Sequence, residues 1–266
     1  MPTPLMRSAR AYLLSFDGVN DELIDIHLFE WKKGKKTSIP KLYRSMLNHA
    51  KNRQSMPNTI GDVEKLSEIL FKFNPAKVVA EYDDHFDLID AIKKANIKTP
   101  VKIDKNNNRS HWSIYLKSAI SSAKFLAAFK KADEFHDFVE SFYGNPYSRL
   151  ALPLLLKEEI EGFGFALSCD FLKENGYSGF AKPDTHINDI CRAVGISSAK
   201  TDFGVFKDVI AYCTAQNIVP YEFDKLMWLV GSGNFYLADL KIKTKKHDFI
   251  NIYKKSTTAK QKRSAL

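Results

Sequence analysis

Cysteines are few in this sequence of 266 residues, and long apolar runs are absent from it. Cys169, Cys191 and Cys213 lie far apart and have neither the spacing of a zinc site nor the four ligands of an iron–sulfur cluster. We therefore expect reduced thiols and no such cluster. No apolar run reaches the ~18 residues of a membrane span, and the stretch 11–16 is too short for a secretory signal. These absences predict a cytoplasmic protein without a membrane contact.

Acidic residues are in deficit, and the deficit is uneven. The sequence has 40 Lys and Arg against 31 Asp and Glu, which gives a formal net charge of +9. From Leu240 onward, eight Lys and one Arg stand against a single acid, Asp248, so this segment carries most of the excess. A second basic run extends from Lys32 to Arg53. Such blocks suit a polyanion, because each neutralised phosphate releases counterions, although a solvated tail that only aids solubility accounts for the same charges.

Strand signals are scarce, whereas helical periodicity recurs along most of the chain. Thr59 is placed to cap a helix over 60–73, and residues 85–95 repeat the pattern. Periodicity does not decide between a strand and a helical turn over 76–82, and residues 11–16 permit a strand. The pattern predicts an all-α fold, with at most a short β element near the N-terminus. Further helices are expected over 110–130, 132–143, 147–160, 165–175, 184–194, 203–216 and 221–231.

The most informative stretch runs from Leu154 to Gly195. A helix that is predicted to end at Ile160 is followed by Gly162-Phe163-Gly164, and a second helix restarts immediately afterwards. Two glycines around one apolar residue permit a tight turn and leave backbone N–H groups bare at the start of the second helix. Such amides, together with the helix dipole, can hold a phosphate. A helix–helix corner without a ligand is the alternative explanation for Gly-x-Gly alone.

Asp184 follows Pro183 and is placed to cap the next helix, whose apolar face is Ile187, Ile190, Cys191 and Val194. Capping alone would explain this aspartate. An aspartate beside a phosphate-binding hairpin is also well placed for chemistry at a deoxyribose.

The order of these features resembles the helix-hairpin-helix, Gly/Pro-rich loop, aspartate signature of the endonuclease III-like DNA glycosylases. Gly162-Phe163-Gly164 stands at the hairpin, residues 176–181 at the loop, and Asp184 in an Asp-Thr-His-Ile context at the aspartate. The resemblance covers only 154–195. It implies a monomeric, two-lobed helical enzyme of DNA repair, which flips a modified base out of double-stranded DNA and cuts its N-glycosidic bond. In a bacterium such an enzyme would be associated with the nucleoid.

Residue roles follow from the resemblance. Asp184 would stabilise the cationic, oxocarbenium-like sugar and orient or deprotonate the attacking water, while Gly162, Phe163 and Gly164 would contact DNA. Ala166 stands where the family's bifunctional members have a lysine, so hydrolysis by water without AP lyase activity is expected. Lys182 and Lys157 are near in sequence and could supply an amine for a lyase step, but phosphate contact is the role expected of both.

Other expectations from the resemblance concern the base and a cation. A flipped base needs stacking faces, and the candidate pocket residues are Trp112, Tyr115, Phe165, Tyr221 and Trp228. No cofactor is required. The family's hairpin can hold a structural monovalent cation through main-chain carbonyls, which here would be those of Glu158, Ile160 and Phe163.

The loop 105–110, with three consecutive asparagines, is expected to separate residues 1–105 from a glycosylase body over 106–253. Residues 1–105 match nothing in the family and are expected to pack on that body. Residues 254–266 would form a basic, flexible tail in which Lys254 and Lys255 contact DNA.

The sequence leaves the substrate and one other function open. The base could be an alkylated purine, an oxidised guanine, or a bulky phage base such as glucosylated hydroxymethylcytosine, which would make the enzyme part of antiviral defence. A non-catalytic helix-hairpin-helix DNA-binding protein, in which Asp184 serves only as a cap, would have the same sequence features.

Overall fold

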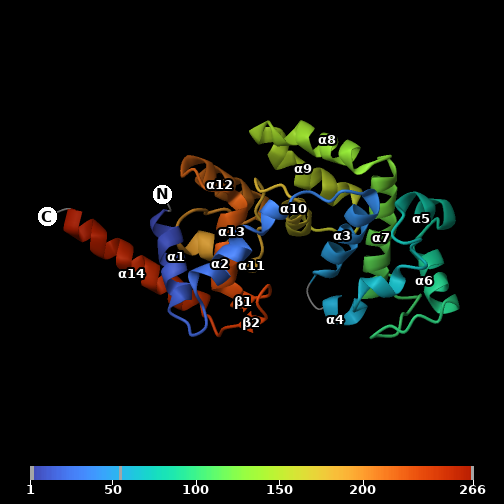
Figure 1. Cartoon of the computed structure of the whole chain (residues 1–266), viewed down its shortest axis with the longest axis horizontal. Helices are drawn as coiled ribbons and strands as arrows, with labels where there is room; N and C mark the ends of the chain where they lie inside the picture. Colours follow the sequence, from blue (N-terminus) through green and yellow to red (C-terminus); the bar gives the residue numbers. More distant parts are fainter. Residues whose placement is uncertain (1–2, 54–55, 265–266) are drawn as a thin grey trace. The chain divides into compact units, whose positions relative to one another are not determined.

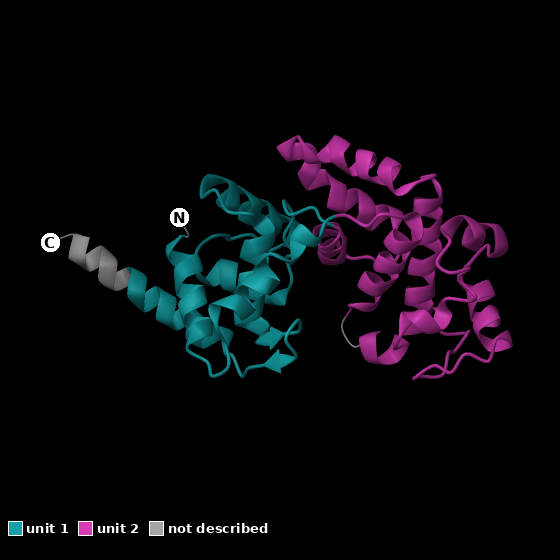
Figure 2. Cartoon of the chain, viewed as in Figure 1, with its two compact units in different colours: residues 1–34, 176–266 teal, residues 35–175 magenta. Residues whose placement is uncertain are grey.

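The computed structural model describes residues 3–53 and 56–264, with side chains described as far as residue 257. The chain forms two compact units (Figures 1 and 2). Unit 1 consists of Met1–Gly34 and Gly176–Leu266, and unit 2 consists of Lys35–Asn175. The expected all-α class is confirmed, since helices dominate both units.

Unit 2 is built around helix α7 (His111–Ala127), on which α3, α4, α5, α6 and α9 pack. Residues on several sides of α7 are buried, among them Tyr115, Leu116, Ala119 and Ala123, so this helix forms the core of the unit. The other elements of unit 2 are α3 (Ile39–Lys51), α4 (Met56–Ile60), η2 (Val63–Leu66), α5 (Pro75–Glu81), α6 (His85–Lys94), α8 (Ala132–Tyr143), α9 (Pro146–Glu159) and α10 (Phe165–Glu174).

Unit 1 is built around helix α13 (Pro220–Ser232), which contacts α1, α2, α11, α12 and α14. Because two of these helices come from the first 34 residues, the unit joins both ends of the chain. A small antiparallel hairpin, β1 (Asn234–Phe235) with β2 (Leu240–Lys241), follows α13. The remaining elements are α1 (Pro4–Leu14), α2 (Asp21–Leu28), η1 (Glu30–Lys33), α11 (Thr185–Ala193), α12 (Asp202–Ala215) and α14 (Lys246–Ser264).

The expectation of a strand near the N-terminus is wrong. Residues 11–14 belong to α1, because Thr3 caps that helix, Pro4 opens it, and Leu5, Ala9 and Leu13 bury one face at helical spacing. Residues 76–81 are likewise helical, in α5. The two-stranded hairpin lies instead at 234–241.

The helix expected over 60–73 is also absent from the described chain. Thr59 lies inside α4, and Gly61 turns the backbone with a φ of +73°. After the short η2, three consecutive residues, Phe71, Lys72 and Phe73, have positive φ. Leu70 and Phe73 reach the core through this succession of turns rather than through a helix.

The units divide the chain differently from the sequence-based boundaries. The boundary expected at 105 falls inside unit 2, and the start of the expected tail at 254 falls inside α14. The side chains of Lys260, Lys262 and Arg263 lie outside the described residues. Within the described part, no helix has both the length and the apolar character needed to cross a membrane.

Candidate active site

The hairpin between α9 and α10 is fastened to the core helix of unit 2. Within the turn, Phe163 N donates to the Ile160 carbonyl at 3.0 Å. Two serines of α7 then hold Glu161: Ser118 Oγ donates to its carbonyl at 2.6 Å, and Ser121 Oγ accepts from its N–H at 2.9 Å. The serines lie three residues apart, so they face the same side of α7. Nothing in the sequence pattern singled them out.

Gly162 is required by this packing. Its φ is +84°, and a Cβ atom there would lie 2.5 Å from Ser118 Oγ and 3.2 Å from the Ile114 carbonyl oxygen. A side chain would therefore meet both an unfavourable backbone conformation and the helix beneath it.

Gly164 differs in every respect. It is exposed, its φ is −86°, and a Cβ atom there would have no neighbour within 4 Å. As the N-cap of α10 it offers no side chain to the first amides of that helix. A helix start without a side-chain cap keeps the positive end of its dipole available to an anion.

The predicted pocket residues that belong to unit 2 are buried. Phe163 and Phe165 are buried at the hairpin, while Trp112 and Tyr115 lie inside unit 2 with their rings edge to face at 6.1 Å. Burial raises the pKa of Tyr115. The Trp112 indole nitrogen and the Tyr115 hydroxyl have no hydrogen-bond partner among the described residues.

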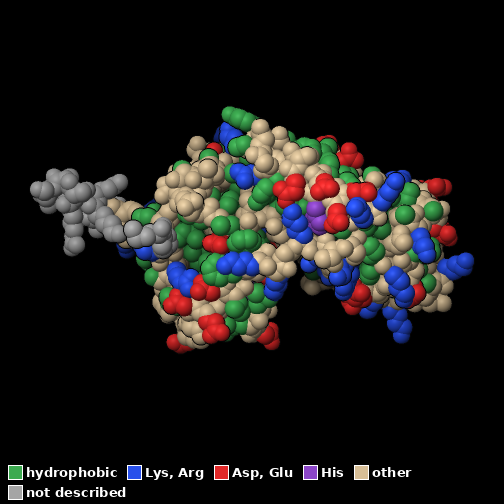
Figure 3. Space-filling view, turned by 45° about the horizontal axis from the view of Figure 1, so that its top comes forward, with side chains coloured by type: hydrophobic (Ala, Val, Ile, Leu, Met, Phe, Trp, Pro, Cys, Tyr) green, Lys and Arg blue, Asp and Glu red, His purple; other side chains and the backbone are tan. Residues whose placement is uncertain are grey.

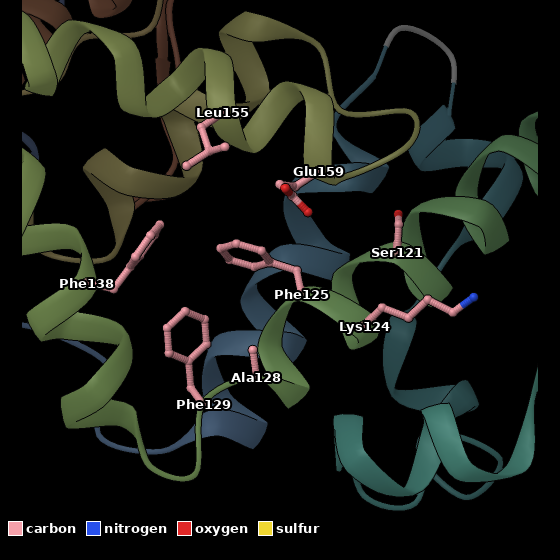
Figure 4. A pocket seen from close by; sticks show the side chains of 8 residues that line it. All are labelled: Ser121, Lys124, Phe125, Ala128, Phe129, Phe138, Leu155 and Glu159. Atoms are coloured by element: carbon pink, nitrogen blue, oxygen red, sulfur yellow. The ribbon is translucent and has the colours of Figure 1, made fainter.

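The surface of unit 2 has a hollow of about 440 Å³ between α7, α8 and α9. Phe125, Phe129 and Phe138 point toward one another across it (Figure 4). The hollow adjoins the hairpin through Ser121 and Glu159, but none of the predicted pocket residues lines it.

Asp184 begins helix α11 in unit 1. Its Oδ1 accepts from His186 N at 2.9 Å and from Ile187 N at 3.1 Å, which is an N-cap with two amide donors. Its Oδ2 has no hydrogen bond within the described chain, and the side chain is half-buried. One oxygen thus fixes the carboxylate while the other stays available.

The segment around Asp184 runs along α13 and contacts it at three successive positions, which are called levels here. Tyr221 N donates to the Ser178 carbonyl at 2.9 Å, and Lys182 N donates to Asp224 Oδ2 at 3.1 Å. Further along, the His186 ring packs so closely on Gly231 that a Cβ atom there would lie 2.4 Å from its Nδ1. Asp184 lies between the second and third of these levels, which places it beside the stretch of α13 that carries Trp228.

The other predicted residues of unit 1 divide by exposure. Tyr221 is fully buried, whereas Lys182 and Trp228 are half-buried. Lys254 and Lys255 are exposed on α14, which is anchored by buried Phe249 and Ile250.

Basic side chains do not gather on the face shown in Figure 3, where Lys and Arg lie interspersed with Asp and Glu.

The predicted site residues are divided between the two units. The hairpin, Trp112, Tyr115, Phe165 and the expected cation ligands belong to unit 2. Asp184, Lys182, Tyr221, Trp228 and the basic helix α14 belong to unit 1.

The cysteines supply no reactive thiol to either group. All three are buried, and no disulfide links them. Burial raises the pKa of Cys213 to about 12, and that of Cys191 also rises through burial. A thiol of high pKa is a poor nucleophile at neutral pH.

Comparison with known proteins identifies the fold. No protein-family model matches the sequence, and no curated protein sequence matches it. The structure is similar to the crystal structure of the 8-oxoguanine DNA glycosylase of Thermotoga maritima, with a TM-score of 0.50 and 14% identity. The similarity covers 86% of this chain and 99% of that one. The chain thus has a fold like that of this DNA glycosylase.

Proposed function

We propose that the protein is a monofunctional DNA glycosylase of the endonuclease III-like superfamily. It flips a modified base from double-stranded DNA and hydrolyses the N-glycosidic bond, which leaves an abasic site. The observation that carries the proposal is Asp184, whose carboxylate is fixed through one oxygen by two amides. The similarity of the fold to that of a DNA glycosylase supports it.

Asp184 would act on the sugar. As the glycosidic bond breaks, positive charge develops on the deoxyribose, and Oδ2 can face that charge while Oδ1 remains bound to the start of α11. A carboxylate held in advance needs no reorganisation, so it stabilises the transition state by about 3 kcal/mol in a water-poor site. The same oxygen can orient or deprotonate the attacking water.

The hairpin would position the DNA without reading its sequence. The uncapped amides at the start of α10 suit a phosphate, and Gly164 lets the phosphate approach because no side chain intervenes. Lys182 and the basic helix α14, with Lys254 and Lys255, would add sequence-independent affinity.

Ala166 supports hydrolysis by water. It is half-buried in the first turn of α10 and has no amine that could attack the sugar. The expected product is an abasic site in an unbroken strand.

The hairpin carbonyls suit a hard cation such as K⁺ or Na⁺, because they are neutral oxygen donors. The Ile160 carbonyl accepts one hydrogen bond, from Phe163 N, and has a second lone pair for an ion. With the carbonyls of Glu158 and Phe163 it would stiffen the turn.

Base release from a panel of duplexes tests the proposal. The duplexes carry 8-oxoguanine, an N-alkylated purine or glucosylated hydroxymethylcytosine, and mass spectrometry identifies the released base. 8-Oxoguanine is the first base to test, because the similar solved structure is that of an 8-oxoguanine DNA glycosylase. Release of glucosylated hydroxymethylcytosine would indicate a role in antiviral defence, and release of a damaged base a role in repair.

Asp184→Asn should abolish release yet keep DNA affinity and stability near those of the wild type, because asparagine caps a helix about as well as aspartate. Asp84→Asn is the matched control, since Asp84 caps α6 through two amides in the same manner. Equal turnover by Asp184→Asn would contradict the catalytic role. DNA binding without release of any base would favour the non-catalytic alternative.

Borohydride trapping tests the monofunctional assignment. No covalent protein–DNA adduct is expected, and strand breaks should appear only after alkali or heat. An adduct would show that a lysine attacks the sugar, with Lys182 and Lys157 the first to substitute.

A further inference from the structure

Tyr236, which directly follows β1, is held by two charged side chains of unit 1. Lys225 Nζ donates to its hydroxyl at 2.6 Å, and the hydroxyl donates in turn to Glu30 Oε2. Lys225 is only 5% exposed, and its Nζ lies 4.9 Å from the centroid of the Tyr236 ring and 5.3 Å from that of Tyr221. The hydroxyl therefore uses its proton and a lone pair within the protein.

The backbone around Tyr236 is fastened as well. His27 Nε2 accepts from Leu237 N at 3.2 Å, and the His27 ring meets the Tyr236 ring edge to face at 4.9 Å. Even so, Tyr236 remains 40% exposed. Burying a lysine destabilises a fold unless the lysine is paired. Here a buried, paired lysine and a glutamate fix a ring that is still exposed to solvent.

Trp228 completes a pair of rings. Its ring centroid lies 5.9 Å from that of Tyr236, with an interplanar angle of 72°, and the side chain is half-buried. Trp228 also lies on the stretch of α13 that runs beside Asp184. The two rings form an aromatic corner on the same unit as the proposed catalytic carboxylate.

We propose that the aromatic corner of Trp228 and Tyr236 stacks the extruded base, and that Lys225 and Glu30 are positioning residues that fix Tyr236. The inference rests on the proposed glycosylase function. One ring can lie against the face of a planar heteroaromatic base while the other meets its edge. Because the Tyr236 hydroxyl is bound to Lys225 and Glu30, the corner selects a base by its planarity and size.

The corner also gives Tyr221 a different role from the one predicted. Tyr221 is fully buried and lies against Lys225, so it supports the lysine instead of touching the base. The ring exposed to a base on that side is Tyr236, which sequence reasoning did not select.

Affinity for two duplexes tests the corner. One carries the base that is released best in the panel, or 8-oxoguanine if none is released, and the other carries a tetrahydrofuran abasic analogue at the same position. The Asp184→Asn background prevents turnover. Since base–aromatic stacking typically contributes ~1–3 kcal/mol, Tyr236→Ala and Trp228→Ala should each weaken binding of the base-containing duplex by roughly fivefold to a hundredfold. Binding of the abasic duplex should change less than about twofold.

Tyr236→Phe separates the ring from its hydroxyl. It keeps the stacking face but loses both hydrogen bonds that fix the ring, so it should lose part of the base-dependent affinity, as should Lys225→Met, which loosens the ring. Both losses should be smaller than that of Tyr236→Ala. Tyr147→Ala is the control, because Tyr147 is 84% exposed in unit 2 and belongs to no proposed site. Melting temperatures of all variants exclude a general loss of fold.

The outcomes separate this inference from the function on which it rests. Equal losses on the two duplexes, or no loss on either, would overturn the corner even if the wild type releases a base. A selective loss without base release by the wild type would retain the corner as a base-binding site and refute the glycosylase.

Discussion

The two hairpin glycines should respond in opposite ways to the same substitution. Gly162→Ala should destabilise the fold and Gly164→Ala should not, although the residues are two apart. In Gly162→Ala the added methyl would lie 2.5 Å from Ser118 Oγ, the atom that donates to the Glu161 carbonyl at 2.6 Å. The substitution therefore acts on the bond that fastens the hairpin to α7.

The magnitude follows from two contributions. A non-glycine residue at a φ of +84° costs about 1–2 kcal/mol, and displacing the Ser118 hydroxyl costs a further ~1 kcal/mol for its hydrogen bond. The sum is about 2–3 kcal/mol, or a fall in melting temperature of roughly 4–12 °C for a chain of this size. Gly164 has an ordinary φ and open space around it, so the loss of a preferred N-cap is offset by the lower entropy of the unfolded chain.

Thermal unfolding by circular dichroism and fluorescence anisotropy with a labelled duplex measure the two effects. Gly164→Ala should keep its melting temperature within about 2 °C but bind all duplexes more weakly and alike, because phosphate contacts carry no sequence information. Ser118→Ala should recover part of the stability lost in Gly162→Ala, since it removes the closest atom. The reasoning would be refuted if Gly162→Ala had the melting temperature of the wild type, or if the melting temperature of Gly164→Ala were as low as that expected for Gly162→Ala.

Three further outcomes are expected. Burial lowers the pKa of His27, so the unfolded chain takes up a proton at this residue before the folded chain does as the pH falls below about 6.5. The free energy of unfolding should therefore fall on acidification below that pH. In His27→Gln, the difference between the free energies of unfolding measured in urea at pH 7 and pH 5.5 should be smaller. Gly231→Ala should lower the melting temperature by several degrees, about 4 °C or more, because its methyl would overlap the His186 ring; an unchanged value would contradict the close packing of α11 on α13. Truncation after Tyr253 should reduce the slope of log binding constant against log salt concentration by about 0.9 for each phosphate that the shortened chain no longer neutralises. The ranking of substrates should stay unchanged. An unchanged slope would mean that the end of α14 does not touch DNA.

The features predicted well from the sequence are those that local rules determine. The end of α9, the start of α10 and the position of Asp184 as a cap all depend on residues within a few positions of one another. Glycine at a positive φ, proline before a cap and an apolar face at helical spacing act over that range.

The region 60–73 shows where such rules fail. Its apolar residues have helical spacing, but spacing records only which side chains are buried, not the path between them. Gly61 and the three positive-φ residues at 71–73 bury the same side chains through turns. The bond from the Tyr82 hydroxyl to the Ile69 carbonyl, at 2.9 Å, satisfies a backbone group that a helix would otherwise have satisfied.

Sequence reasoning selects Trp228 but not Tyr236, because groups that fix the Tyr236 ring come from distant parts of the chain. Glu30 and Tyr236 are 206 residues apart, and a lysine such as Lys225 ordinarily belongs to a solvated helix face. Only when the first 34 residues pack on α13 do Glu30 and His27 reach the β hairpin. The N-terminal segment, to which the sequence assigned no role, thus completes the unit that carries Asp184. It also supplies the Glu30 carboxylate, which holds Tyr236 of the aromatic corner in place.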